Sequence, residues 1–285
     1  MGPRKPGGTV SLLLRVGLFA FLSVAGLFLF PVLMVPAAGY LVGSVMGAFT
    51  AAAVANAVAL RIYERGRLAD IGLGWTRASR QNLFVGIIGG CGAASLAIVP
   101  ALATGMARLR PEPEYGGGWP AVFFVTLILL FGAFGEEMLF RGYGFQVMLR
   151  VAGPFATILP VSLLFALAHT ANQNATLLAL ANTAGWGVIL GVAFLRSGDL
   201  WLPVGLHFGW NWALPMLGAN LSGFKMGVTG YVLEWRVSEL WSGGAYGPEG
   251  GLFTSTVLGA LAVYLWKAPI EGQQAYLVRS SKEGA

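Results

Sequence analysis

Charged residues are scarce in this sequence. Of its 285 residues, 11% are Asp, Glu, Lys or Arg and 56% are hydrophobic, and the mean hydropathy is +0.71. Soluble globular chains carry about 25% charged residues, so this chain has too few to cover a water-facing surface of its size. The composition argues against a soluble enzyme, a disordered chain and a nucleic-acid-binding module. We therefore expect a multi-pass membrane protein.

Cysteine and histidine are also nearly absent. The single cysteine, Cys91, lies in an apolar stretch and excludes both an intramolecular disulfide and a cysteine-based metal site. The only two histidines, His169 and His207, fall within or at the edge of apolar segments. The net charge of +6 does not indicate a nucleic-acid partner, because the basic residues collect in short segments between apolar runs.

Long apolar runs fill most of the chain. A helix that spans the bilayer needs about 20 mainly apolar residues, and eight segments meet this requirement. We predict one all-α bundle of about eight transmembrane helices, with a fourth segment long enough for a span and an interfacial turn. The predicted spans are residues 10–35, 37–61, 82–107, 119–150, 154–170, 175–196, 201–219 and 251–269.

Lys and Arg are distributed unequally between the two sides of this predicted bundle. With the N-terminus in the cytoplasm, thirteen fall on the cytoplasmic side and four on the opposite side. Cytoplasmic segments of membrane proteins carry an excess of Lys and Arg, so both termini are predicted to be cytoplasmic. The thirteen are Arg4, Lys5, Arg15, Arg61, Arg65, Arg67, Arg77, Arg80, Arg150, Arg196, Lys267, Arg279 and Lys282, and the four are Arg108, Arg110, Lys225 and Arg236.

Three charged residues interrupt the fourth apolar segment. Each ionised side chain at the centre of a span costs about 2.5–3.5 kcal/mol on insertion scales, so these side chains should face the bundle interior or a water-filled cavity. Glu137 and Arg141 are four residues apart in the order that favours an ion pair on a helix. Glu136 points about 100° away from Glu137. A buried packing network would explain Glu137 and Arg141, which pair with each other, but it would give the Glu136 carboxylate no partner.

The two histidines and an asparagine provide further polar groups on other spans. His169 lies near the end of the fifth span, where it could be an ordinary interfacial side chain. His207 and Asn211 are four residues apart in the seventh span and can face the same point, although a structural hydrogen-bonded pair is also consistent with this spacing. A Glu, two His and an Asn on three spans together favour one shared site.

These segments resemble the motifs of the CPBP family of intramembrane proteases, also called the Abi or CAAX-protease family. The resemblance covers roughly residues 120–220 and includes the stretch that leads into the last motif, residues 196–207. The three motifs occur in the family's order and match at every motif position: Glu136-Glu137-x-x-x-Arg141, Phe165-x-x-x-His169 and His207-x-x-x-Asn211.

The resemblance implies an eight-helix bundle whose site lies inside the membrane and opens towards the cytoplasmic side. It divides the single domain into N-terminal membrane helices (1–118), catalytic core helices (119–220), and a loop with the last helix (221–285). Eukaryotic relatives remove the last three residues of prenylated CAAX proteins, and some bacterial relatives are linked to bacteriocin self-immunity. The implied roles are water activation for Glu136 and His169, an oxyanion hole for His207 and Asn211, and support of the site for Glu137 and Arg141.

The residues themselves are compatible with peptide hydrolysis. No Ser or Cys has a convincing nucleophile setting, so a water activated by the Glu136 carboxylate is the remaining choice. His169 can orient that water or protonate the leaving amine, while Asn211 and His207 can donate hydrogen bonds to the oxyanion. The expected partners are a membrane-associated protein or peptide substrate and the lipid bilayer, without nucleic acid.

Two alternatives remain open from the sequence. Two His and a Glu are acceptable zinc ligands, although the His-Glu-x-x-His helix of many zinc proteases is absent and the resemblance favours catalysis without a metal or cofactor. The polar cluster could also be the ligand or proton site of a non-enzymatic membrane scaffold, transporter or bacteriocin-immunity protein. The oligomeric state cannot be predicted from this pattern.

Overall fold

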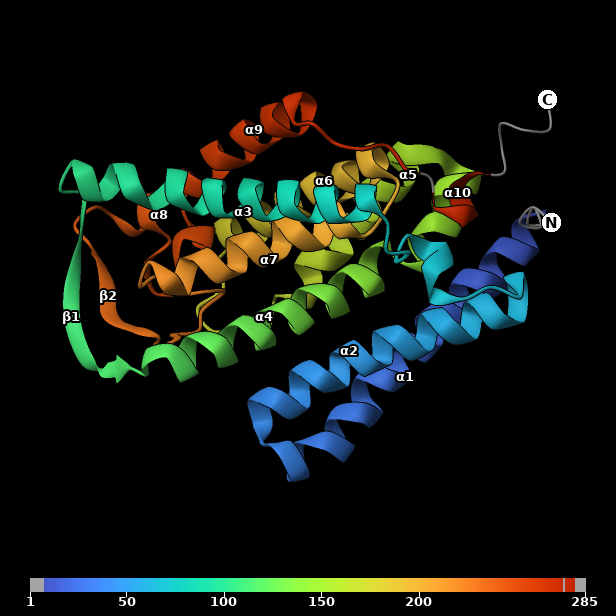
Figure 1. Cartoon of the computed structure of the whole chain (residues 1–285), viewed down its shortest axis with the longest axis horizontal. Helices are drawn as coiled ribbons and strands as arrows, with labels where there is room; N and C mark the ends of the chain where they lie inside the picture. The colour runs from blue at the N-terminus through green and yellow to red at the C-terminus, as the bar shows by residue number, and fades with distance from the viewer. Residues whose placement is uncertain (1–7, 274, 280–285) are drawn as a thin grey trace.

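The computed structural model describes residues 8–273 and 275–279, so Arg4, Lys5 and Lys282 of the charge count lie outside the described residues. The described chain is mostly helical, and its eight longer helices run roughly along one common direction (Figure 1). These helices are α1 (Gly8–Ala38), α2 (Tyr40–Ala59), α3 (Arg77–Ala103), α4 (Gly118–Arg141), α5 (Tyr143–Ala168), α6 (Leu177–Ser197), α7 (Trp201–Met216) and α9 (Leu252–Lys267).

Short elements connect the long helices. A two-stranded antiparallel sheet, which the all-α prediction did not include, pairs β1 (Ala107–Gly116) with β2 (Thr229–Trp235) at one end of the bundle (Figure 1). Both strands are edge strands, which explains how β1 accommodates two prolines. The remaining elements are the π-helix η1 (Leu60–Glu64), the 3₁₀ helices η2 (Leu68–Ile71), η3 (Gly244–Tyr246) and η4 (Pro248–Gly250), and the one-turn helices α8 (Glu239–Ser242) and α10 (Tyr276–Arg279).

The outer surface of the bundle is strongly apolar. Large hydrophobic side chains project outward, including Phe28, Phe155 and Leu177, which are 74%, 84% and 87% exposed. Exposed apolar area on this scale is typical of a surface that faces lipid. Five helical stretches of the described chain are long and apolar enough to cross a membrane: residues 8–38, 40–64, 77–103, 118–168 and 177–197. The prediction of a multi-pass membrane protein is confirmed.

The fourth predicted segment, residues 119–150, was expected to be long enough for a span and an interfacial turn. In the structure its helix breaks at Gly142, and the next eight residues belong to α5, which has a second non-helical point at Gly153. Buried Asn56 of α2 stabilises the first break, because it accepts a hydrogen bond from the Tyr143 N–H (2.7 Å) and donates one to the Met138 carbonyl (2.9 Å). A Cβ at Gly142 would lie only 2.2 Å from that carbonyl.

Glycines bring α3 and α7 into backbone contact. A Cβ at Gly90 would lie 2.2 Å from the Leu206 carbonyl oxygen, and a Cβ at Gly205 would lie 2.4 Å from the Leu83 carbonyl oxygen. Small residues allow this close approach between membrane helices. The main buried core lies around α3, α6, α7 and α9, and a second cluster joins α5 to the inner faces of α1 and α2. The glycine contact therefore fixes α7, the helix that carries His207, against the main core.

Candidate active site

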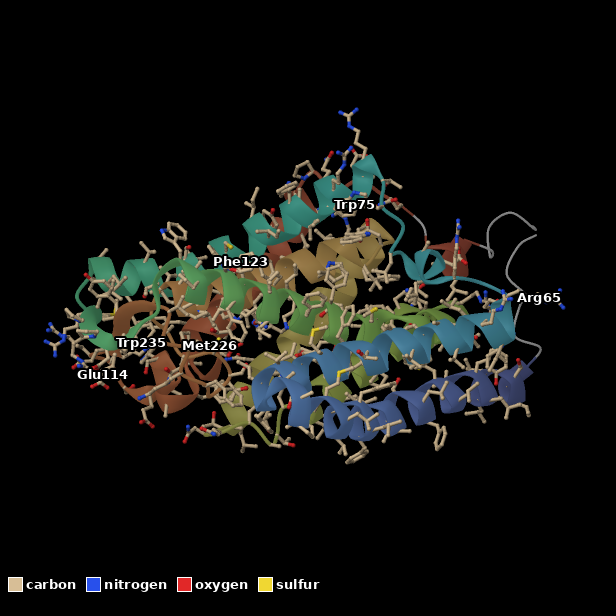
Figure 2. All side chains as sticks on the ribbon, turned by 60° about the horizontal axis from the view of Figure 1, so that its bottom comes forward. Arg65, Trp75, Glu114, Phe123, Met226 and Trp235 are labelled. Atoms are coloured by element: carbon tan, nitrogen blue, oxygen red, sulfur yellow. The ribbon has the colours of Figure 1, made fainter. Side chains whose placement is uncertain are left out.

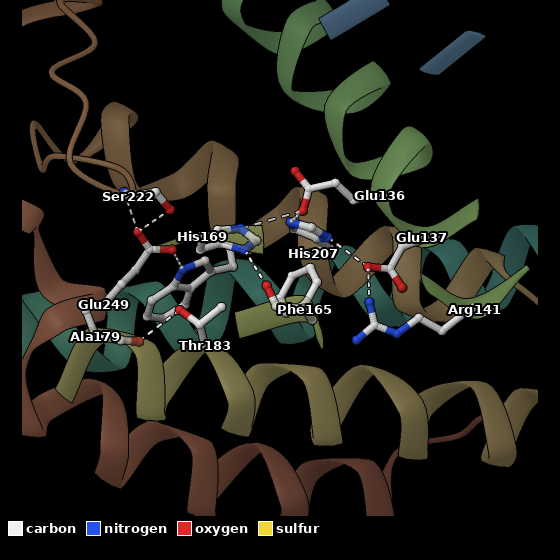
Figure 3. A network of polar contacts seen from close by, with 11 residues as sticks. Glu136, Glu137, Arg141, Phe165, His169, Ala179, Thr183, His207, Ser222 and Glu249 are labelled. Atoms are coloured by element: carbon white, nitrogen blue, oxygen red, sulfur yellow. Dashed lines mark hydrogen bonds and ion pairs between the residues drawn. The ribbon is translucent and has the colours of Figure 1, made fainter. Parts of the chain in front are cut away.

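Glu136 lies between the two histidines of the chain. Its Oε2 atom is 3.8 Å from Nε2 of His169 and 3.8 Å from Nε2 of His207, so three different helices or helix ends meet at one carboxylate (Figure 3). Both distances exceed a direct hydrogen bond but suit groups that share one bridging water. The Glu136 side chain is 35% exposed, and its Oε2 has no hydrogen-bond partner among the described residues. The sequence pattern placed the Glu136 carboxylate outside the Glu137–Arg141 ion pair, and in the described structure its Oε2 accepts no hydrogen bond.

The position of His169 follows from its spacing to Phe165. Directly after the end of α5, the Nδ1–H of His169 donates to the carbonyl oxygen of Phe165, four residues earlier, at 2.7 Å. Because a carbonyl can only accept, this bond places the proton on Nδ1 and leaves the Nε2 lone pair of a neutral imidazole facing Glu136. The Phe165 ring also packs 4.7 Å from the His169 ring and 6.0 Å from the His207 ring. One residue thus orients both histidines.

His207 is oriented by the second glutamate of the pair. Buried Glu137 accepts a hydrogen bond from His207 Nδ1 at 2.8 Å and another from Arg141 Nη1 at 3.2 Å (Figure 3). The ion pair expected between Glu137 and Arg141 is confirmed. Arg141 also donates to the Gly187 carbonyl of α6 at 3.0 Å and lies 4.9 Å from the centre of the Phe165 ring. The Glu137–Arg141 pair therefore connects α4 with both α6 and α7.

A partly open cavity of about 670 Å³ contains the candidate residues. Glu136, His169, His207 and Asn211 all line it, so the structure brings together the four residues for which a catalytic role was predicted. Glu137 and Arg141 lie behind its wall, where their side chains are fully buried. The cavity combines a polar end at the two histidines with apolar walls from α2 and α4, an arrangement that suits an apolar polypeptide segment next to a reacting peptide bond.

Glu249 is a second carboxylate at this cavity that the sequence pattern did not reveal. It lies in η4, and it accepts hydrogen bonds from the Trp210 indole (3.1 Å) and from the backbone and hydroxyl of Ser222 (Figure 3). Burial raises the pKa of Glu249 above its ordinary value, and the hydrogen bonds from Trp210 and Ser222 oppose that rise. The only sequence signal is an isolated acid among glycines, directly before the last apolar segment.

Among the described residues, no group of three or more His, Cys, Asp or Glu side chains has the arrangement needed to hold a metal ion. The ring nitrogens that face Glu136 are both Nε2, since each Nδ1 is engaged elsewhere.

Residues 118–213 match the family model of the Rce1-like type II CAAX prenyl endopeptidases. The chain is also similar to an Escherichia coli protein described as an uncharacterized 24.3 kDa protein, with 34% identity over 149 residues. That alignment covers 50% of this chain and 62% of the relative, so the chain spans less than two thirds of the relative's length. No solved structure gives a significant match. The matched family region includes the four cavity residues of the sequence prediction but excludes Glu249.

Proposed function

Because residues 118–213 form a domain of the Rce1-like type II CAAX prenyl endopeptidase family, we propose that this protein is an intramembrane endopeptidase. It hydrolyses a peptide bond of a membrane-associated protein or peptide, using a water activated by Glu136 and His169. The single observation that carries the proposal is the position of Glu136 Oε2, at 3.8 Å from Nε2 of both histidines inside one cavity. We further propose eight spans, with both termini in the cytoplasm.

In the first step a water lies between Glu136 and His169 and donates hydrogen bonds to the carboxylate and to the free Nε2 lone pair. Glu136 takes one proton as general base, and the resulting hydroxide attacks the carbonyl carbon of the peptide bond. The electron pair of the C=O π bond moves to the oxygen, which becomes an oxyanion. Proximity of base and water within one buried site favours this step because no solvent reorganisation is needed.

In the second step the tetrahedral intermediate collapses. The Asn211 amide and the Nε2–H of His207 donate to the oxyanion, and His207 offers that second N–H in its imidazolium form, since Nδ1–H is held by Glu137. The C–N bond breaks as the C=O bond re-forms. The proton held by Glu136 passes to the leaving amine, directly or through His169. The products are a new carboxylic acid and a new amine, and the enzyme returns to its starting state.

Substitution of the proposed base tests this function. Membranes from cells that express the wild type or Glu136→Gln are compared by mass spectrometry for peptides with new C-termini, and the peptides found then serve as substrates for the purified proteins. We expect turnover of Glu136→Gln to fall by about 10²–10⁴-fold, the usual contribution of a general base. Glu114→Gln on exposed strand β1 is the control for the same chemical change and should match the wild type.

Identical sets of new C-termini in the wild-type and Glu136→Gln membranes would contradict the proposal. The same purified preparations are assayed after treatment with a strong chelator and analysed for bound metal. Full activity without stoichiometric metal agrees with the water activation described here, whereas loss of activity that returns on addition of zinc would replace it with a zinc mechanism. Melting curves of each variant in detergent separate loss of chemistry from loss of fold.

A further inference from the structure

Glu249 is a carboxylate at the cavity that the proposed reaction does not use. Its Oε1 accepts a hydrogen bond from the Trp210 indole at 3.1 Å, and its Oε2 accepts two from Ser222. A carboxylate offers about four acceptor sites, so one site on Oε1 has no donor among the described residues. In the part of the chain that the structure describes, no Lys or Arg side chain forms an ion pair with Glu249. Glu249 therefore has hydrogen bonds but no permanent counter-ion.

Burial makes the lack of a counter-ion unfavourable. Glu249 is only 9% exposed. Its burial raises its pKa, and the hydrogen bonds from Trp210 and Ser222, together with positive charge on His169, oppose that rise. Removing a charge from water costs free energy unless an opposite charge compensates for it. A cation that entered the cavity beside Glu249 would supply this compensation.

The Glu249 carboxylate is also held in place before any ligand binds. Asn182 of α6 donates hydrogen bonds to the backbone carbonyls of Glu249 and Gly251, both at 2.9 Å. Ser222, from the segment that follows α7, holds the carboxylate itself through its backbone N–H and its hydroxyl. A group fixed in this way loses little conformational freedom when it binds a ligand. Glu249 is therefore preorganised for recognition.

Two indole rings lie beside this carboxylate. Trp210 donates to it, and the Trp186 ring packs on Trp210 with the ring centres 4.9 Å apart. Both tryptophans line the cavity, and the buried Nε1 of Trp186 has no hydrogen-bond partner among the residues described. Tryptophan is the aromatic side chain that attracts cations most strongly. A carboxylate next to indole rings suits an ammonium or a guanidinium group.

We infer that Glu249 and the two indoles form a subsite for a Lys or Arg side chain of the substrate. In Figure 3, His169 lies between Glu249 and Glu136. The leaving amine receives its proton from Glu136, directly or through His169, so the residues that follow the cleaved bond lie nearest to Glu249. The basic side chain thus belongs to the first or second residue after the cleaved bond. The inference rests on the proposed endopeptidase function and names a substrate preference of the same site.

Paired peptides test this subsite. Each peptide found by the membrane comparison described above is synthesised with Lys, Met or Glu at the first or second position after the cleaved bond. We expect wild-type kcat/KM to be at least tenfold higher for Lys than for Met at one of these positions, and lowest for Glu. Glu249→Gln should lower kcat/KM for the Lys peptide at least tenfold more than for the Met peptide.

Glu114→Gln is the matched control, because it makes the same chemical change far from the cavity. Figure 2 shows Glu114 at one end of the molecule, and its side chain is exposed on β1. This variant should keep the wild-type preference for Lys. A wild type that does not distinguish Lys from Met at either position overturns the inference. An equal loss of kcat/KM for all peptides in Glu249→Gln also overturns it, because Glu249 would then only hold the fold.

Two further observations keep the test decisive if Glu249→Gln does not fold in detergent. The comparison of Lys, Met and Glu peptides on the wild type needs no variant. Trp186→Phe then replaces Glu249→Gln, and it should lower the ratio of kcat/KM for Lys over Met at least twofold, because phenylalanine attracts cations less strongly than tryptophan. An unchanged ratio in Trp186→Phe would remove the indole from the proposed subsite.

A binding measurement separates this inference from the proposed function. Labelled Lys and Met peptides are titrated onto Glu136→Gln, where binding requires no hydrolysis; an apolar Leu/Ala peptide with one central Lys or Met serves as a second probe pair. We expect the Lys peptide to bind at least tenfold more tightly, and the Glu136→Gln, Glu249→Gln double variant to lose this difference. Normal hydrolysis by Glu136→Gln would remove the proposed function and leave the binding result standing. An inactive Glu136→Gln that binds both peptides equally would retain the function and remove the subsite.

Discussion

Glu137 of α4 and His207 of α7 are joined by a buried hydrogen bond of 2.8 Å between Oε1 and Nδ1. The bond fixes the orientation of the ring and turns Nε2 towards Glu136, on the adjacent position of α4. Two consecutive glutamates thus face the two nitrogens of one imidazole. One carboxylate is available for chemistry in the cavity, and the other is buried where it can only hold the ring.

Glu137→Gln tests this division of roles. The amide keeps the shape of the side chain but removes the negative charge that stabilises imidazolium His207. We expect kcat to fall by roughly 10²-fold or more, because one oxyanion donor is weakened, while KM changes little, since Glu137 lies behind the cavity wall. Steady-state kinetics on the peptides found by mass spectrometry give both values. A change in KM alone would contradict the positioning role.

Arg141→Lys tests the connection from α4 to α6. The guanidinium pairs with Glu137, donates to Gly187 and stacks on Phe165, and a lysine ammonium cannot make these contacts together. We expect the free energy of unfolding to fall by about 1.5–3 kcal/mol, the range for a buried hydrogen bond to a charged group. Melting in detergent measures the loss.

Arg108→Lys is the matched control for that change. Arg108 also makes a bidentate contact with a glutamate, Glu234, but this pair is half exposed on the β1–β2 sheet. Exposed ion pairs contribute about 0–1 kcal/mol. Equal loss of stability in the two variants would show that burial of Arg141 has no special effect.

Part of the site could be predicted because its signals are local. The four-residue spacings of Glu137 with Arg141 and of His207 with Asn211 follow from helix geometry, and the pairing of Glu137 with Arg141 is confirmed. The energetic penalty of charge in an apolar run also identified Glu136 as a residue that needs a cavity. The convergence of separate helices was expected from the motifs, and the structure shows it.

Other features depend on contacts between distant segments and leave little trace in the sequence. The break at Gly142 follows directly after Arg141 with no proline to mark it, and it is stabilised by Asn56 of another helix. Strand β1 contains two prolines, and every second residue from 108 to 114 is charged, a pattern that does not predict a strand. Its strand structure depends on pairing with the distant β2. Glu249 is held at the cavity by hydrogen bonds from Trp210 and Ser222, which are distant in sequence.

Gly205→Ala tests the contact between α3 and α7. The added methyl would lie 2.4 Å from the Leu83 carbonyl and 3.0 Å from Gly86 Cα, both backbone atoms that cannot move aside. We expect a loss of about 1–3 kcal/mol of stability, as for other overpacked sites, and lower turnover, because α7 carries His207 and Asn211. Gly92→Ala in α3 has open space around the new methyl and should be neutral or slightly stabilising.

Glu249→Gln gives a prediction for the pH dependence of stability. Burial raises the pKa of Glu249 above its ordinary value of 4.5 in the folded protein. As the pH rises above that ordinary value, the unfolded chain releases its proton before the folded protein does. The stability that the protonated form contributes is therefore present at low pH, and it is lost as the pH rises through the folded pKa.

A glutamine at position 249 does not titrate, so this loss should disappear. We expect the melting temperature of Glu249→Gln, relative to the wild type at the same pH, to increase from pH 4.5 upward and to level off once the pH exceeds the folded pKa of Glu249. Rearranged hydrogen bonds to Trp210 and Ser222 change the difference by a constant, so only its slope with pH tests the prediction. Glu114→Gln, an exposed acid on β1, should show no such slope. A difference between Glu249→Gln and wild type that is constant with pH would mean that the carboxylate is ionised in the cavity wall throughout, as a fixed negative charge beside His169.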